Sequence, residues 1–165
     1  NSKTMKKFSK LIICFMLLVT THANAGEFSA SVGNFDSSDK FKKTSMIDLT
    51  YGFTEKNIDT SIGQIKPMVG VFLAENKAGM IYAGGKIDYK LGMFIITPSF
   101  TPGFYSEGDG KDMGNVLEFK SQLNIGLDLE NNSILSLGFS HVSNGNLGDK
   151  NPGADTFLFN FSKQF

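Results

Sequence analysis

Apolar side chains alternate with polar ones along most of this chain. In the segment "NVLEFKSQLNIGLDLE" (115–130), odd positions such as Leu117 and Phe119 are apolar, whereas even positions such as Glu118 and Lys120 are polar. A period of two is typical of β-strands, because successive side chains point to opposite faces of a sheet. The sequence therefore predicts an all-β protein.

The same alternation recurs in segments that are separated by clusters of Gly, Asp and Asn. Several of these segments exceed the roughly 9–11 residues that a tilted strand needs to cross a bilayer. A soluble β-sandwich produces the same alternation, so both architectures remain open at this point. The eight predicted strands are 27–34, 44–53, 64–75, 79–91, 93–105, 115–129, 133–143 and 155–165.

The aromatic residues favour the membrane alternative. The chain ends in "FLFNFSKQF", in which Phe157, Phe159 and Phe161 alternate before the final Phe165, and this resembles the C-terminal strand of outer-membrane barrels. Sixteen phenylalanines and four tyrosines are enough for an apolar band and for aromatic girdles at its borders. We predict an eight-stranded antiparallel transmembrane β-barrel of the bacterial outer membrane, with a secreted sandwich as the alternative.

An export signal is predicted at the start of the chain. From Met5 the sequence reads "MKKFSKLIICFMLLVTTHANA", with two lysines, an apolar run and small residues up to Ala25. This order is that of a secretory signal peptide. We therefore expect residues 1–25 to comprise upstream residues and a signal peptide cleaved after Ala25. Residues 26–165 then form a single β-barrel domain.

Removing that segment changes the chemistry that the chain can offer. Cys14 and His22 leave with it, so the expected mature chain has no cysteine and one histidine, His141, which excludes disulfides and thiol catalysis. Four of the sixteen lysines also leave, but none of the sixteen acidic residues, so the net charge becomes −4. No basic surface for nucleic acid is predicted.

Charged side chains on the polar faces of the predicted strands point into the barrel. Because side chains fill a barrel of eight strands, we expect these charges to form a paired plug rather than a pore, with Glu118 and Lys120 as partners. With both termini in the periplasm, the connections 34–43, 76–78, 106–114 and 144–154 lie outside the cell. The inward charged residues are Asp48, Lys86, Asp88, Glu118 and Lys120.

Three polar residues fall on the apolar, lipid-facing side near the predicted extracellular rim. Stepping by two from Leu137 and Phe139 puts His141 and Ser143 on that side, and stepping back from Phe157 on the next strand puts Asp155 there. A nucleophile, its base and an orienting acid have this composition. Polar residues at a strand end also occur simply at the level of the lipid headgroups, so this interpretation competes with a structural one.

A family resemblance favours the catalytic interpretation. The motif "FSHVSNG" followed by "NPGAD", together with the earlier "PSFTPGFY" and "LEFKSQLNIG", resembles the PagL-type lipid A 3-O-deacylase family, from about Ile96 to the end. The resemblance implies an outer-membrane hydrolase without a metal or other cofactor. It also implies His141 as base and Ser143 as nucleophile. The family acid is usually glutamate, whereas this chain has Asp155, with Asp149 as the less favoured substitute.

The resemblance also implies residues that stabilise the oxyanion. Asn151 matches the side chain proposed for that role in the family, and a backbone N–H in the loop that begins at Gly145 supplies a second donor. Asn144 matches a motif asparagine and is either a supporting residue of the site or a turn residue.

Lipid A, the lipid part of lipopolysaccharide, is the substrate that the resemblance implies, with the ester-linked 3-hydroxyacyl chain at the 3-position removed. Outer-membrane lipids are the other expected partner, nucleic acid is not expected, and homodimer formation is left open. Two alternative functions also remain. One is an outer-membrane phospholipase or esterase with the same three residues, and the other is a non-enzymatic small barrel that serves as an adhesin or stabilises the membrane.

Overall fold

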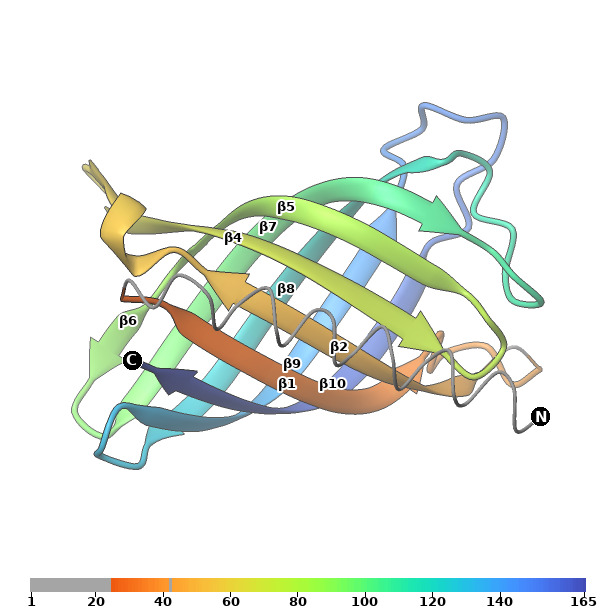
Figure 1. The fold of residues 1–165 in the computed structure, drawn as a ribbon. Helices are drawn as coiled ribbons and strands as arrows, with labels where there is room; N and C mark the ends of the chain where they lie inside the picture. Colours follow the sequence, from red (N-terminus) through yellow and green to blue (C-terminus); the bar gives the residue numbers. More distant parts are fainter. Residues whose placement is uncertain (1–24, 42) are drawn as a thin grey trace.

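The alternating segments form a single antiparallel sheet, in a computed structural model that describes residues 25–41 and 43–165 (Figure 1). The predicted signal peptide, apart from its last residue, lies outside the described residues. The strands are β1 (Glu27–Phe35), β2 (Thr44–Gly52), β3 (Ile58–Thr60), β4 (Gly63–Ala74), β5 (Gly79–Ile87), β6 (Tyr89–Leu91), β7 (Phe94–Ser106), β8 (Leu117–Asp128), β9 (Ser133–Ser143) and β10 (Ala154–Gln164), with one 3-10 turn, η1 (Thr54–Lys56).

The sheet closes into a barrel. Its strands follow the order β2-β1-β10-β9-β8-β7-β5-β4-β3, and an additional pairing of β2 with β4 completes the ring. β6 continues β5 along β7, and β3 is a short strand folded onto β4, so eight long strands surround the barrel. Each overlaps one of the eight predicted segments, which confirms the predicted antiparallel barrel and makes the sandwich alternative wrong.

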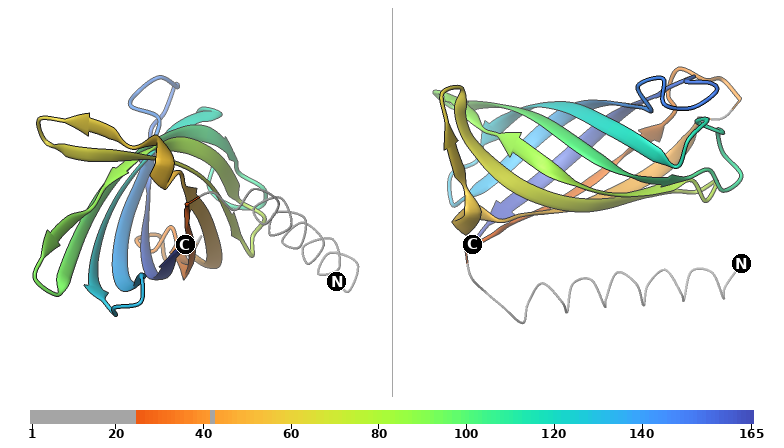
Figure 2. Two further views of the ribbon diagram at one scale, coloured as in Figure 1. Left: turned by 60° about the vertical axis from the view of Figure 1, so that its left-hand side comes forward. Right: turned by 90° about the horizontal axis from the view of Figure 1, so that it is seen from above.

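The two ends of the barrel differ in the length of their connections. The segments 36–41, 75–78, 107–116 and 144–153 lie at one end, here called the loop end, and the C-terminus lies at the other (Figure 2). At the C-terminal end the turns are short, except for 53–62, which contains η1 and β3. Within the described residues, no helix is long and apolar enough to cross a membrane.

The outer surface of the barrel is apolar. Ile81, Phe104, Leu137 and Phe157, which come from four different strands, are each more than half exposed. Exposed apolar surface this extensive is unfavourable in water, whereas lipid chains cover it without penalty.

The interior is polar in the half of the barrel that lies away from the loop end, and its charged side chains are paired across strands. Lys66 Nζ lies 2.7 Å from Glu27 Oε2 and 3.0 Å from Asp88 Oδ2, and Lys86 donates to Glu27 as well. These contacts agree with the expected plug.

One expected pair is wrong. Lys120 bonds to Asp48 on β2 and not to Glu118, because both side chains leave β8 in the same direction and reach across the lumen separately. Glu118 is fully buried, and neither of its carboxylate oxygens has a hydrogen-bond partner among the described residues. Asn144 is its polar neighbour, but both amide hydrogens of Asn144 are donated to backbone carbonyls.

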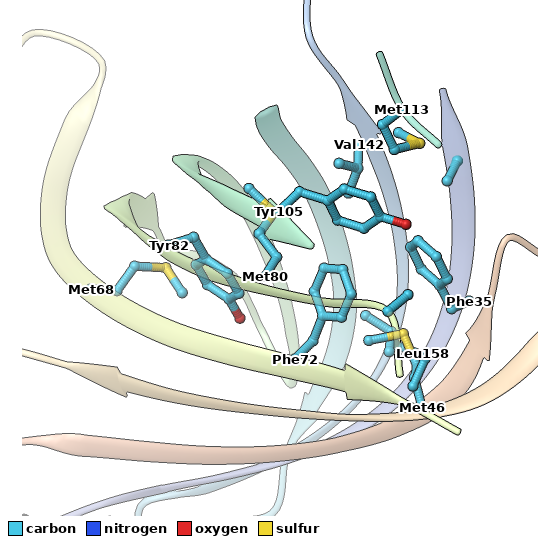
Figure 3. Packing of buried hydrophobic residues seen from close by; sticks show 13 residues of the cluster. Phe35, Met46, Met68, Phe72, Met80, Tyr82, Tyr105, Met113, Val142 and Leu158 are labelled. Atoms are coloured by element: carbon cyan, nitrogen blue, oxygen red, sulfur yellow. The ribbon is translucent and has the colours of Figure 1, made fainter. Parts of the chain in front are cut away.

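Large apolar side chains fill the interior toward the loop end (Figure 3). Phe35 packs against Phe72 and Tyr105, with ring centroids 5.2 and 6.1 Å away. Met113, from the loop 107–116, and Val142 on β9 are also almost completely buried in this cluster. The lumen below the loops is therefore closed by packing, and any site for a lipid at this end must lie on the outer surface.

Candidate active site

The β9–β10 register brings the predicted histidine and acid together. His141 lies directly opposite Asp155, and its Nδ1 is 2.7 Å from Asp155 Oδ1. Both side chains are on the outer surface, with 48% and 34% of their area exposed. When Nδ1 carries the proton, it donates to Asp155 and leaves Nε2 as a proton acceptor. Asp149, the alternative acid, lies exposed within the loop 144–153, and the carboxylate in contact with His141 is that of Asp155.

Ser143 occupies the same face, two residues further toward the loop end. Two strand residues span about 7 Å between Cα atoms, and among the described residues no hydrogen bond joins Ser143 Oγ to His141. Across the β8–β9 pair, Ser143 faces Phe119. Hydrogen bonds between a nucleophile and its base are often loose before substrate binds, so this arrangement is compatible with proton transfer.

Gly153 fixes the position of the histidine ring. A Cβ atom at this position would lie 2.8 Å from Cε1 and 3.3 Å from Nε2 of His141, so the ring rests directly against the glycine backbone. The φ angle of Gly153 is +65°, which favours glycine over other residues. Sequence reasoning did not assign this residue, although it lies within the quoted motif "NPGAD".

Lys111 connects Gly153 to the rest of the loop end. Its Nζ donates to the carbonyl of Gly153 at 3.2 Å and to Asp36 Oδ1 at 2.7 Å, and Asp36 is fully buried. The backbone N–H of Ser37 donates to the carbonyl of Asp155 at 2.7 Å. The first and third loops therefore hold the strand end that carries Asp155 and the glycine behind His141.

A tight turn follows Ser143. Gly145 and Asn146 have φ angles of +62° and +65°, as a type I′ turn requires, and Leu147 N donates to the carbonyl of Asn144 at 3.1 Å. Asn144 is fully buried, and its amide donates to the carbonyls of Met113 and Lys150 at 2.8 Å each. Its side-chain oxygen accepts from Asn146 N at 2.9 Å. Asn144 therefore occupies the position of a turn residue that supports the loop.

Asn151 lies beside this turn. Its Oδ1 accepts from the backbone N–H of Asn144 at 3.0 Å, and its Nδ2 donates to Asn146 Oδ1 at 3.3 Å. Its side chain is only partly buried, so the second Nδ2 hydrogen remains available. Gly145 is exposed, immediately after Asn144. The structure thus brings the predicted oxyanion residues Asn151 and Gly145 to the turn that adjoins Ser143.

An ion pair joins the third and fourth loops. Lys150 Nζ lies 2.7 Å from Asp112 Oδ2, and Gly114 N donates to Asp112 Oδ1 at 2.8 Å. The hydrogen bond from Lys150, followed by that from Gly114, holds the pKa of Asp112 below its usual range. These two groups lie in the loops, outside the strands that carry His141 and Ser143.

Aromatic side chains surround the three residues on the outer surface. Phe139 and Phe157 lie one step deeper on β9 and β10, with ring centroids 5.2 Å apart, and Phe119 stacks on Phe100 at 5.9 Å. The surface next to the site can therefore contact acyl chains. Among the described residues, no group of three or more His, Cys, Asp or Glu side chains is arranged to hold a metal ion.

A serine that sequence reasoning overlooked lies on the other side of His141. Ser121 of β8 is directly opposite His141 in the β8–β9 register, and it is exposed on the outer surface. The signal was present in the sequence, because Ser121 is a polar residue in the otherwise apolar series from Leu117 to Leu129.

Comparison with known structures supports the fold. The crystal structure of the outer membrane enzyme PagL superposes with a TM-score of 0.66 at 18% identity, covering 83% of this chain and 98% of that one. Neisserial surface protein A (NspA) superposes with a TM-score of 0.54 at 11% identity, covering 86% of this chain and 99% of that one. A comparison with curated protein sequences gave no match.

A family model shows to which family of barrels with this fold the chain belongs. The model of lipid A 3-O-deacylase (PagL) matches residues 74–164, which is more than half of the chain. The matched region contains β5 to β10 in full, and thus every residue of the candidate site. The chain belongs to the lipid A 3-O-deacylase (PagL) family of outer-membrane hydrolases.

Proposed function

We propose that this protein is a serine esterase that removes the ester-linked 3-hydroxyacyl chain from the 3-position of lipid A, with Ser143, His141 and Asp155 as its catalytic residues. The observation that carries the proposal is the 2.7 Å contact between His141 Nδ1 and Asp155 Oδ1 on the lipid-facing surface. A histidine and a carboxylate are costly to keep on a lipid-facing surface, and ionisable residues at such positions in membrane proteins commonly belong to a functional site.

In the first half of the reaction, His141 Nε2 takes the proton of the Ser143 hydroxyl as Oγ forms a bond to the ester carbonyl carbon. The bond between that carbon and the sugar oxygen then breaks, and the imidazolium returns the proton to the sugar oxygen. Asp155 remains ionised, keeps the imidazole in the required tautomer and offsets the charge of the imidazolium.

In the second half, water replaces the sugar. His141 removes a proton from the water as its oxygen attacks the acyl carbon, and the bond to Ser143 Oγ breaks while Oγ regains a proton from His141. The products are a 3-hydroxy fatty acid and lipid A with a free 3-hydroxyl. Each half of the reaction passes one proton through Nε2. No atom changes its oxidation state, so no redox partner is needed.

Negative charge develops on the carbonyl oxygen in both halves. We assign its stabilisation to the free Nδ2 hydrogen of Asn151 and to a backbone N–H of the turn at Gly145. Asn144 has no donor left for this purpose, since both of its amide hydrogens are bonded to carbonyls. Its role in the proposal is to hold the turn in place.

The outward position of the site suits a substrate that is itself part of the membrane. An acyl chain in the outer leaflet reaches Phe119, Phe139 and Ser143 by lateral diffusion, with its hydrocarbon in lipid throughout. The loop end then faces outside the cell, as expected for a barrel with both termini in the periplasm. A lumen closed by Phe35 and Phe72 offers no such route.

Mass spectrometry of lipid A tests the proposal. Expression of the protein in a bacterium with hexa-acylated lipid A should yield a species that lacks one 3-hydroxyacyl group, and Ser143→Ala should abolish it. The matched control is Ser45→Ala, which removes an exposed serine from β2 near the same end. Unchanged lipid A from folded wild-type protein would contradict the proposal, and release of fatty acid from phospholipid instead would favour the phospholipase alternative.

A further inference from the structure

Ser121 is a polar interruption of an apolar outer face. The outward side chains of β8 are Leu117, Phe119, Ser121, Leu123, Ile125 and Leu127. The Ser121 hydroxyl is exposed and makes no hydrogen bond to any described residue. A hydroxyl without a partner is unfavourable next to hydrocarbon, so its presence in the lipid-facing surface requires an explanation.

The position of Ser121 links it to the site. Ser121, His141 and Asp155 form a row across β8, β9 and β10, because each is directly opposite the next in the register. Side chains directly opposite in antiparallel strands have Cβ atoms about 4.5–5.5 Å apart. Ser121 is therefore adjacent to His141, on the side away from the acid.

The histidine ring leans away from Ser121. Its Nδ1 contacts Asp155 on β10, and its Cε1 and Nε2 atoms lie against Gly153, just before β10. The Ser121 hydroxyl is thus not part of the path that carries the proton. It is left open to a group on the substrate.

The substrate of the proposed function has a hydroxyl that fits this position. In a 3-hydroxyacyl ester the hydroxyl is on the carbon that lies two carbon–carbon bonds from the carbonyl carbon that Ser143 attacks. Ser121 and Ser143 are diagonal neighbours across β8 and β9, about 7–8 Å apart. A carbonyl carbon about 3 Å from Ser143 Oγ, with its chain directed toward the middle of the membrane, brings its 3-hydroxyl within about 3 Å of Ser121.

We propose that Ser121 binds the 3-hydroxyl of the scissile acyl chain and makes the enzyme selective for 3-hydroxyacyl esters over plain acyl esters. This inference rests on the proposed function. A site that hydrogen-bonds a substrate hydroxyl discriminates against analogues that lack it, because its own polar group is then left unpaired. For one neutral hydrogen bond at an exposed site, we expect about tenfold selectivity.

The test uses two substrates that differ in one hydroxyl. Lipid A with a 3-hydroxyacyl chain at the 3-position and lipid A with a plain acyl chain of equal length are presented in the same vesicles. We expect Ser121→Ala to lower kcat/KM about tenfold for the hydroxylated ester and to leave the plain ester unchanged. Ser121→Thr, which keeps a hydroxyl, should retain the preference, and Ser45→Ala should behave as the wild type. A heat-dependent shift in gel mobility verifies folding of each variant.

The outcomes separate this inference from the proposed function. A preference that Ser121→Ala leaves intact, or an equal loss on both substrates, would overturn the inference while the esterase assignment stands. Activity that survives Ser143→Ala would overturn the proposed mechanism instead. Wild-type protein that cleaves neither ester would refute the proposed function, and the inference with it.

Discussion

Replacement of Lys120 by methionine should destabilise the barrel by about 3 kcal/mol. Lys120 is 3% exposed, and its ammonium bonds to the Asp48 carboxylate and lies 4.4 Å from the centroid of the Tyr82 ring. Removal of one partner from a buried ion pair costs about 3–5 kcal/mol, because the other charge loses its compensation. We expect the lower value, since Asp48 keeps the hydrogen bond that the Tyr82 hydroxyl donates.

Replacement of Glu118 should not destabilise the barrel, although Glu118 lies only two residues from Lys120 on the same strand. Its carboxylate is fully buried without a hydrogen-bond partner in the described part of the chain. Glu118→Gln keeps the shape of the side chain and replaces a buried carboxyl group that has no partner by a neutral amide. The free energy of unfolding should therefore stay the same or rise by about 1 kcal/mol.

Urea unfolding in lipid vesicles measures both effects, with the folded fraction read from the heat-dependent shift in gel mobility. The double variant Asp48→Asn/Lys120→Met is the control, because it removes both charges and should recover most of the lost stability. Wild-type stability of Lys120→Met would refute the argument. So would a loss in Glu118→Gln as large as that in Lys120→Met, because Lys120 would then have Glu118 as its partner.

Further predictions concern the outer site, with turnover on lipid A as the measurement. Gly153→Ala should lower kcat at least tenfold in a folded barrel, since the new methyl group displaces His141 and the φ angle of +65° disfavours alanine; unchanged turnover would contradict the packing argument. Asp155→Asn should lower kcat by about 10²–10⁴-fold, whereas Asp155→Glu should keep substantial activity. An active Asp155→Asn together with an inactive Asp149→Asn would reassign the role of the acid to Asp149. Lys111→Met should reduce both stability and turnover, because its ammonium holds the Gly153 carbonyl; full turnover would show that this contact does not position the ring.

Sequence periodicity was sufficient to predict which residues face outward from the barrel and that His141 and Asp155 lie close together. A step of two along each strand decides whether a side chain points outward, and an antiparallel neighbour at the same rim then follows. The same rule puts Asn144, one step after Ser143, on the inner side.

Contacts between strands that are distant in the sequence could not be predicted from that rule. The partner of Lys120 depends on which strands face one another across the lumen, and no local pattern gives the separation between Asp48 on β2 and Lys120 on β8. Gly153 was missed for a related reason, because its importance lies in the absence of a side chain where the ring of His141 rests. Ser121 broke the pattern visibly, but its relation to His141 required the β8–β9 register.

The paired charges of the lumen have a consequence for how the strands find their alignment. A slip of one residue between neighbouring strands reverses their faces, but a slip of two preserves the apolar outside and the polar inside. Such a slip moves each side chain about 7 Å along the barrel, so Lys66 would lose Glu27 and a buried charge would remain without a partner. Discrete ion pairs therefore distinguish alignments that hydrophobicity alone leaves equal. Side chains that never contact lipid thereby help to keep His141 level with Asp155 on the opposite side of the barrel wall.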